Sequence, residues 1–236
     1  MKRTHVPLLT WLRVAWHMTN TKAGISTLSI ERSMGLNHKT AWHLTHKIRT
    51  AMGQARGAKL SGTVELDETY VGGHEEGGQG AAAASSNKSC VIIAAEQSTI
   101  SDRKNPGSTV TVAGRIRMRR SYDASIYCLE VFISENIAPG STLLTDGWLN
   151  YPPALRRLKD THGLMYLHKP VSVRASTKPA HALLPGVHRA ASLLKWWLSG
   201  IHQGAVRDHQ LDHYFKSSSS ATTGVGRPAV ACSFGD

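Results

Sequence analysis

The chain has 236 residues, of which 41% are hydrophobic, so it is long enough to build a core, and disorder throughout is excluded. Its 28 lysines and arginines outnumber 16 acidic residues, and the formal charge of +12 favours a polyanionic partner such as nucleic acid. No apolar run approaches the ~20 residues of a membrane span, and no signal-peptide core is present, so we expect a cytoplasmic protein. The three widely spaced cysteines indicate neither a disulfide framework nor a paired-cysteine zinc site.

The first part of the chain predicts three helices. Residues 8–22 have helical apolar spacing, Gly24 ends that helix, and Ser26 caps a short second helix that Gly35 ends. A third helix is expected over residues 38–52. The expected buried residues are Leu8, Leu9, Leu12, Trp16 and Met18 in the first helix, and Ala41, Trp42, Leu44, Ile48 and Met52 in the third.

The other side of the third helix is basic, and its candidate DNA-binding residues are Lys39, His43, His46, Lys47 and Arg49. A short helix, a glycine-containing turn and a longer basic helix are typical of a helix-turn-helix domain, whose second helix lies in the DNA major groove. We therefore predict a small helix-turn-helix DNA-binding region over residues 1–52. An ordinary three-helix bundle with a solvated basic face is the alternative.

The rest of the chain predicts an α/β domain. Residues 53–62 are rich in glycine and alanine and read as a linker, residues 72–88 as a flexible loop, and residues 216–236 as a disordered tail. Strands followed by alternating helices and strands favour a mixed sheet with flanking helices over residues 63–215. The expected strands are residues 63–71, 90–96, 109–118, 126–133, 142–145 and 164–167, and the expected helices are residues 148–158 and 185–198.

Two aspartates are the strongest candidates for chemistry. Asp67 lies in the run VELDETYVGG and Asp146 in the run STLLTDGW, each at the end of an apolar strand where a carboxylate needs a partner. Two such carboxylates indicate a divalent metal site, and a pair of ions about 3.5 to 4 Å apart serves in-line attack at phosphorus. The simpler alternative is that both are turn residues. We expect the neighbouring Glu65 and Glu68 to be solvated.

A two-metal site usually takes a third ligand from a helix, and the polar candidates on the last helix are His188 and Lys195. They are seven residues apart, so they share one face of the helix and lie roughly 10 Å apart along its axis. One group would lie at a metal and the other at a DNA phosphate. Neutral imidazole suits Mn²⁺ or Zn²⁺ better than Mg²⁺, so His188 is a metal ligand, a proton acceptor or merely a helix-start histidine. Three tryptophans are expected to be core aromatics rather than base-stacking platforms: Trp148, Trp196 and Trp197.

Three ordered blocks carry a family resemblance: VELDETYVGG, TDGW and LPGVHRAASLLKWWLSGIHQGAV. Together they resemble the ISXO-like bacterial insertion-sequence transposases of the DDE superfamily, and TWLRVAWHM and KTAW resemble the helical region that precedes their catalytic core. The resemblance spans residues 8–215 and implies a ribonuclease-H-like core. Asp67 and Asp146 match the metal-binding aspartates of the family pattern, His188 stands where other members have glutamate, and Lys195 matches the basic residue.

The resemblance also implies partners and cofactors. We expect two Mg²⁺ or Mn²⁺ ions, double-stranded DNA carrying terminal inverted repeats, a target DNA, a homo-oligomer on DNA and a place in the bacterial nucleoid. Members usually begin with a cysteine-containing zinc ribbon and end in an arginine-rich stretch, so we expect a truncated or frameshifted copy. The alternatives are a catalytically defective DNA-binding remnant and a host metal-dependent nuclease.

Overall fold

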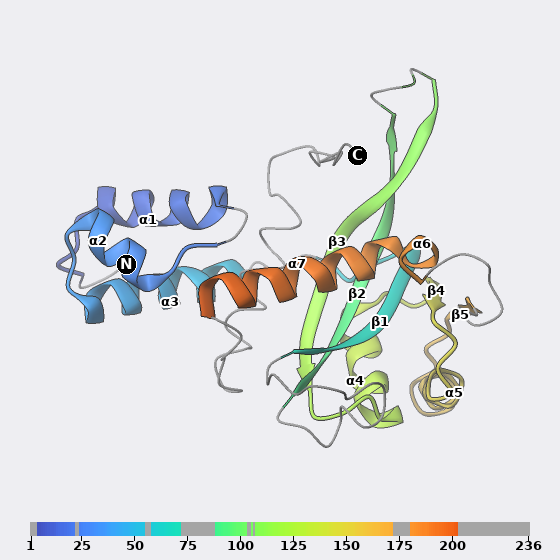
Figure 1. Cartoon of the computed structure of the whole chain (residues 1–236). Helices are drawn as coiled ribbons and strands as arrows, with labels where there is room; N and C mark the ends of the chain where they lie inside the picture. Colours follow the sequence, from blue (N-terminus) through green and yellow to red (C-terminus); the bar gives the residue numbers. More distant parts are fainter. Residues whose placement is uncertain are drawn as a thin grey trace. The chain divides into compact units, whose positions relative to one another are not determined.

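A computed structural model describes residues 4–21, 24–54, 58–71, 88–102, 105, 107–171 and 180–202 (Figure 1). The chain divides into two compact units. One comprises Met1–Arg56 with Leu194–Asp236, and the other is Gly57–Leu193. The loop predicted over residues 72–88, apart from Lys88, and the tail predicted over residues 216–236 lie outside the described residues.

The first unit contains the three predicted helices, α1 (Leu8–Asn20), α2 (Thr27–Met34) and α3 (His38–Gln54). The residues predicted to begin and end the second helix, Ser26 and Gly35, do so in α2. The Ser26 side chain accepts a hydrogen bond from the Ser29 amide, and Gly35 adopts a left-handed φ of 61° that ends the helix. Asn37 then caps α3, because its Oδ1 accepts a hydrogen bond of 2.8 Å from the Thr40 amide.

The buried side of α1 differs from the predicted one. Trp11, Val14 and Met18 are buried against Ile30, Ala41 and Leu44 of the other two helices. The expected core positions Leu8, Leu9, Leu12 and Trp16 are all more than half exposed, and Trp42 of α3 is 38% exposed. Two apolar stripes with helical spacing run along α1, so periodicity alone did not decide between them.

The second unit is built on a five-stranded mixed sheet in the order β3-β2-β1-β4-β5. Its strands are β1 (Thr63–Val71), β2 (Ser89–Ser101), β3 (Thr109–Ser121), β4 (Thr142–Thr145) and β5 (Leu167–Pro170). The first three pair antiparallel, whereas β4 is parallel to both β1 and β5. The arrangement is consistent with the expected ribonuclease-H-like core. The distal parts of β2 and β3 continue as a two-stranded arm beyond the rest of the sheet (Figure 1).

The helices of this part of the chain are α4 (Ile126–Asn136), α5 (Tyr151–His162), α6 (Ala180–Leu183) and α7 (Pro185–His202). The strand predicted over residues 126–133 is wrong, because that segment is α4. Its sequence is a short apolar run, which fits a buried strand or a buried helix equally well. The deciding local signal is Ser125, whose side chain caps the helix by accepting a hydrogen bond from the Cys128 amide.

The main core lies between one face of the sheet and the helices α4 and α5. Alternation along β1 directs Val64 and Leu66 to this face, where they meet Phe132 of α4 and Tyr151 of α5. Leu60, within the expected linker, is also fully buried here, and its amide donates to the Asn136 carbonyl at 2.9 Å. Part of that segment therefore belongs to the folded unit.

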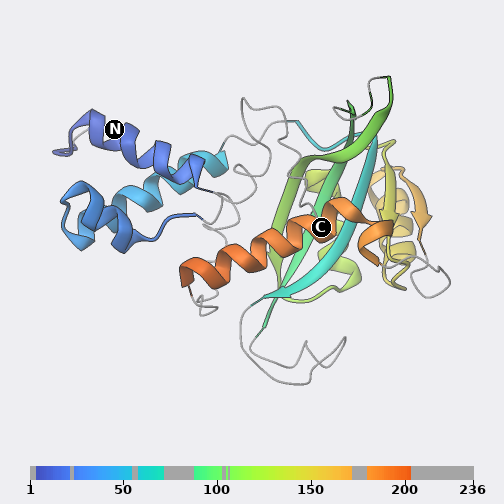
Figure 2. The ribbon, with the colours of Figure 1, turned by 45° about the horizontal axis from the view of Figure 1, so that its top comes forward.

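The opposite face of the sheet receives the start of α7 (Figure 2). A Cβ atom added to Gly186 would lie 2.9 Å from Glu65 Oε2 and 3.3 Å from the Ala95 Cβ. Glycine at this position therefore lets the helix approach β1 and β2 closely. Among the described helices, none is long and apolar enough to cross a membrane.

Candidate active site

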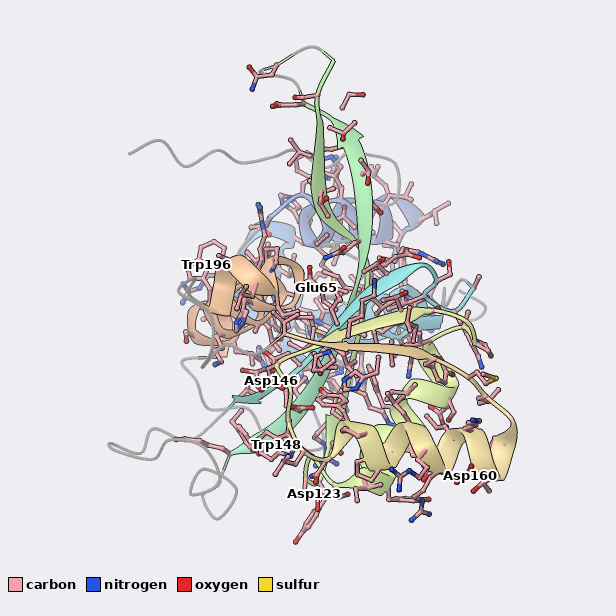
Figure 3. The ribbon with its side chains drawn as sticks, turned by 90° about the vertical axis from the view of Figure 1, so that its right-hand side faces the viewer. Glu65, Asp123, Asp146, Trp148, Asp160 and Trp196 are labelled. Carbon is pink, nitrogen blue, oxygen red and sulfur yellow. The ribbon has the colours of Figure 1, made fainter. Side chains whose placement is uncertain are left out.

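Parallel pairing brings the two predicted aspartates to neighbouring positions. Leu66 of β1 is in register with Thr145, the last residue of β4; Asp67 is the next residue of β1, and Asp146 directly follows β4. Neighbouring strands lie about 4.8 Å apart, so the two aspartates lie side by side on the central strands of the sheet, where β4 ends. The chain reversal after Asp146 is labelled in Figure 3 by Asp146 and Trp148.

The turn after β4 fixes the position of Asp146. Its Oδ1 accepts a hydrogen bond of 3.0 Å from the Trp148 amide, and Gly147 takes a φ of 83° that glycine adopts without strain. Thr145 Oγ1 supports the same turn by accepting from the Gly147 amide at 3.3 Å and lying 2.9 Å from His168 Nε2. These hydrogen bonds therefore hold the Asp146 carboxylate in one position.

His188 lies at the start of α7 and faces Asp67. Its Nε2 is 3.9 Å from Asp67 Oδ2, and the two side chains are 33% and 20% exposed, so the pair is accessible to a ligand. Lys195 is on the same helix about two turns further along, and its side chain is exposed. The structure thus brings Asp67, Asp146 and His188 to one region and leaves Lys195 beyond it along α7.

Glu68 was expected to be solvated, and the structure corrects this. Alternation turns Glu68 to the core side of β1, where its carboxylate accepts a hydrogen bond from the buried Tyr151 hydroxyl. Burial raises the pKa of the Glu68 carboxyl to about 8; the hydrogen bond from Tyr151 opposes the rise, and the negative charges of Asp67 and Asp146 add to it. Three carboxyl groups therefore lie within electrostatic range of one another.

Glu65 was also expected to be solvated, yet it is only 1% exposed. It is two residues from Asp67 and therefore on the same face of β1. Its Oε2 accepts a hydrogen bond of 3.0 Å from the Val187 amide of α7, and its Oε1 accepts one of 2.9 Å from Gln97 Nε2. The signal in the sequence was the alternation itself, which places Glu65 beside Asp67 rather than opposite to it.

The predicted core tryptophans divide into two groups. Trp197 is 9% exposed, whereas Trp148 and Trp196 are 37% and 53% exposed. The expectation was therefore wrong for the latter two. Trp148 lies two residues after Asp146, in the turn that follows β4.

The predicted DNA-binding side of α3 is exposed at Lys39, His43 and Lys47. His46 is partly buried, and its ring lies 4.1 Å from the Trp42 ring, centroid to centroid. Arg49 is only 3% exposed, so it does not lie on the exposed basic side as expected. DNA contact by the remaining four residues stays a prediction.

The donor set of the site suits a divalent cation. Carboxylate oxygens are the ligands that Mg²⁺ prefers, and imidazole also serves Mn²⁺. Burial is the main cause of the raised pKa of Glu68, and the negative charges of Asp67 and Asp146 add to it; a cation bound beside these two aspartates would offset their charges. Within the described parts of the chain, however, no three His, Cys, Asp or Glu side chains are already drawn together as a metal centre.

A comparison with known protein families agrees with this arrangement. The ISXO2-like transposase domain family matches residues 59–218, which is more than half of the chain and includes both aspartates, His188 and Lys195. No curated protein matches the chain. The match agrees with the resemblance carried by the three sequence blocks and with the mixed sheet that holds Asp67 beside Asp146. The chain therefore belongs to the ISXO2-like transposase family.

Proposed function

We propose that this protein is an insertion-sequence transposase that binds terminal inverted repeats and catalyses metal-dependent DNA cleavage and strand transfer. The observation that carries the proposal is the register of the parallel strands, which puts Asp67 beside Asp146 with His188 Nε2 3.9 Å from Asp67 Oδ2. Membership of the family supplies the substrate class, because transposases act on DNA.

The site residues have separate roles in this proposal. Asp67, Asp146 and His188 would hold two Mg²⁺ or Mn²⁺ ions, and ions bound there would supply activation of the attacking water or 3′-hydroxyl and stabilisation of the leaving oxygen. Thr145 and the Trp148 amide orient Asp146. Its carboxylate therefore loses little conformational entropy when it acts in the reaction. Lys195 contacts a DNA phosphate, for which a flexible ammonium group on an exposed helix face is suited.

Binding and chemistry are assigned to different parts of the chain. We assign DNA binding to residues 1–52, with Lys39, His43, His46 and Lys47 on the DNA side, and catalysis to residues 63–215. The overall charge of +12 supports this assignment, because phosphate contacts dominate protein affinity for DNA. Assembly of two or more copies on the paired element ends completes the proposal.

A second candidate is a DNA-binding remnant without catalysis. It is favoured by His188, which stands where the family resemblance expects a glutamate. In this alternative the helical region still binds DNA, but the aspartates do not support cleavage.

Cleavage by the wild-type protein separates the two candidates. The substrate is a duplex carrying the inverted repeats that flank the gene, incubated with Mg²⁺, Mn²⁺ or EDTA. We expect nicks with 3′-hydroxyl ends in either metal, a higher rate in Mn²⁺ because of the His188 ligand, and none in EDTA. Binding of the repeats without nicking in both metals would establish the remnant, and nicking of unrelated duplexes at the same rate would establish a general nuclease.

A further inference from the structure

A buried carboxylate of β1 holds the first turn of α7. Glu65 is 1% exposed, and its two oxygens accept hydrogen bonds from the Val187 amide at 3.0 Å and from Gln97 Nε2 at 2.9 Å. An ionised or even a neutral carboxyl group is costly to bury unless such hydrogen bonds compensate the lost water. The position of Glu65 is therefore fixed by the groups around it (Figure 3).

The start of α7 lacks a cap of its own. The His188 amide bonds to the Leu184 carbonyl, which makes Leu184 the residue before the first helical position. A leucine side chain offers no acceptor, and Pro185 has no amide hydrogen. The Val187 amide is one of the donors that a helix leaves unpaired in its first turn, and Glu65 supplies the missing acceptor from another element. Its negative charge also suits the positive end of the helix dipole.

Gly186 makes this contact possible. A Cβ atom at this position would lie 2.9 Å from Glu65 Oε2 and 3.2 Å from its carboxyl carbon. Distances this short force either the helix or the carboxylate to move. The absence of a side chain at Gly186 therefore lets the carboxylate reach the Val187 amide.

The anchored turn also carries His188. Glu65 and Asp67 lie on the same face of β1, and they meet successive residues of α7: Glu65 contacts Val187, and Asp67 lies 3.9 Å from the ring of His188. Glu65 and Asp67 thus determine how far the first turn of α7 lies from β1 and how the helix is rotated about its axis. A shift of this turn by about 1 Å is enough to cost a reaction on the order of 100-fold.

We propose that Glu65, supported by Gln97 and Gly186, is a positioning residue that caps α7 and holds His188 in place against Asp67. Glu65 itself touches neither the substrate nor a metal. The inference rests on the proposed function insofar as His188 acts in the site. The capping contact itself is independent of that function and is measured separately.

The test compares Glu65→Met with Glu65→Gln in the full-length protein. Methionine retains the length of the side chain but removes both acceptors, whereas glutamine keeps an oxygen for the Val187 amide and turns its NH₂ toward a reoriented Gln97. Amide exchange at Val187 is expected to be at least about 10-fold faster in Glu65→Met and within about 3-fold of wild type in Glu65→Gln.

Function is followed in the same variants by Mn²⁺ affinity and by Mn²⁺-dependent cleavage of the repeat duplex. Glu65→Met should weaken Mn²⁺ binding and slow cleavage, each by at least about 10-fold, while the DNA dissociation constant stays within about 2-fold. Glu65→Gln should restore both. Gly186→Ala should follow Glu65→Met, because its Cβ displaces the carboxylate from Val187.

The matched control removes another buried carboxylate of the same unit. Glu130 belongs to α4, on the face of the sheet opposite to the start of α7; it lies 3.0 Å from Arg157, and its side chain is 8% exposed. Glu130→Met should lower the melting temperature and leave Val187 exchange, Mn²⁺ affinity and cleavage unchanged below that temperature. A Glu65→Met effect that is only structural would resemble this control.

The outcomes test the capping contact and the positioning role of Glu65 separately. Unchanged Val187 exchange in Glu65→Met overturns the capping contact. Faster exchange with wild-type Mn²⁺ affinity and cleavage overturns the positioning role and leaves Glu65 a structural cap. If wild type neither cleaves DNA nor binds Mn²⁺, the proposed function and the positioning role fail together, and the exchange result still decides the cap.

Discussion

Replacement of Asp67 by asparagine is expected to lower metal-dependent cleavage of the repeat duplex by at least about 10³-fold, which corresponds to about 4 kcal/mol of transition-state stabilisation. The change keeps the size of the side chain but removes its negative charge. In the proposal that charge holds a divalent cation beside Asp146. DNA affinity should stay within about 2-fold, because a metal ligand in the sheet is separate from the contacts that bind the backbone phosphates. Single-turnover cleavage and a binding titration measure the two effects.

The control is the same chemical change on α5. Asp160 is exposed, and Figure 3 shows it well away from the Asp146 turn. Asp160→Asn should cleave at the wild-type rate. If Asp67→Asn also cleaves at the wild-type rate, the charge of Asp67 has no part in the reaction and the metal assignment is wrong.

The second large effect is expected at His188. His188→Ala should slow cleavage by at least about 100-fold, or about 3 kcal/mol, because it removes the group that lies 3.9 Å from Asp67 Oδ2. His188→Glu should recover activity and change the metal preference, with the ratio of Mg²⁺- to Mn²⁺-supported rates rising at least about 10-fold. The reason is that a carboxylate oxygen suits Mg²⁺, whereas imidazole favours Mn²⁺.

His162 provides the matched control for this experiment. It is a half-exposed histidine of α5 whose Nε2 lies 3.5 Å from Glu130, within the same folded unit. His162→Ala should retain both the rate and the metal preference. Wild-type cleavage by His188→Ala would show that His188 is only a helix-start histidine, and an unchanged metal ratio in His188→Glu would exclude it as a ligand.

Local signals in the sequence predicted much of the fold. The strand at residues 63–71 and the strand at residues 142–145 were expected with the bounds observed for β1 and β4. β4 is an apolar run ended by the turn at Asp146 and Gly147, whereas β1 continues past Asp67 to Val71, so Asp67 is a mid-strand residue and not the end of its strand as expected. The helix starts at Ser26 and Pro185 were also predicted, because capping and the fixed φ of proline act within one turn.

The errors arose where a pattern had two solutions. The segment Ile126–Asn136 is apolar on nearly all sides, so neither the helical nor the strand period stands out, and only packing on the sheet selects the helix. In α1 two apolar stripes compete, and the tertiary contact with Ile30 selects the one that contains Val14. Such choices depend on neighbours that are distant in the sequence.

The sequence predicted the candidate metal ligands of the site but not the buried residues that position them. Asp67 and Asp146 are marked by their position after apolar runs, and parallel pairing then places them side by side. Glu65 was expected to be solvated because it was assigned to the side of the strand opposite to Asp67 or to a position past the strand end. Its partners, Val187 and Gln97, come from α7 and β2, so its burial follows only from the fold.

The most direct measurement is the anomalous scattering of Mn²⁺ in crystals of the protein bound to a repeat duplex. The central claim is that Asp67 and Asp146 share divalent ions at the end of β4, beside β1. It predicts an anomalous peak within about 2.3 Å of an oxygen of each aspartate, with His188 as a further ligand of one ion. Well-diffracting crystals with Mn²⁺ at saturating concentration and no peak between Asp67 and Asp146 would contradict it.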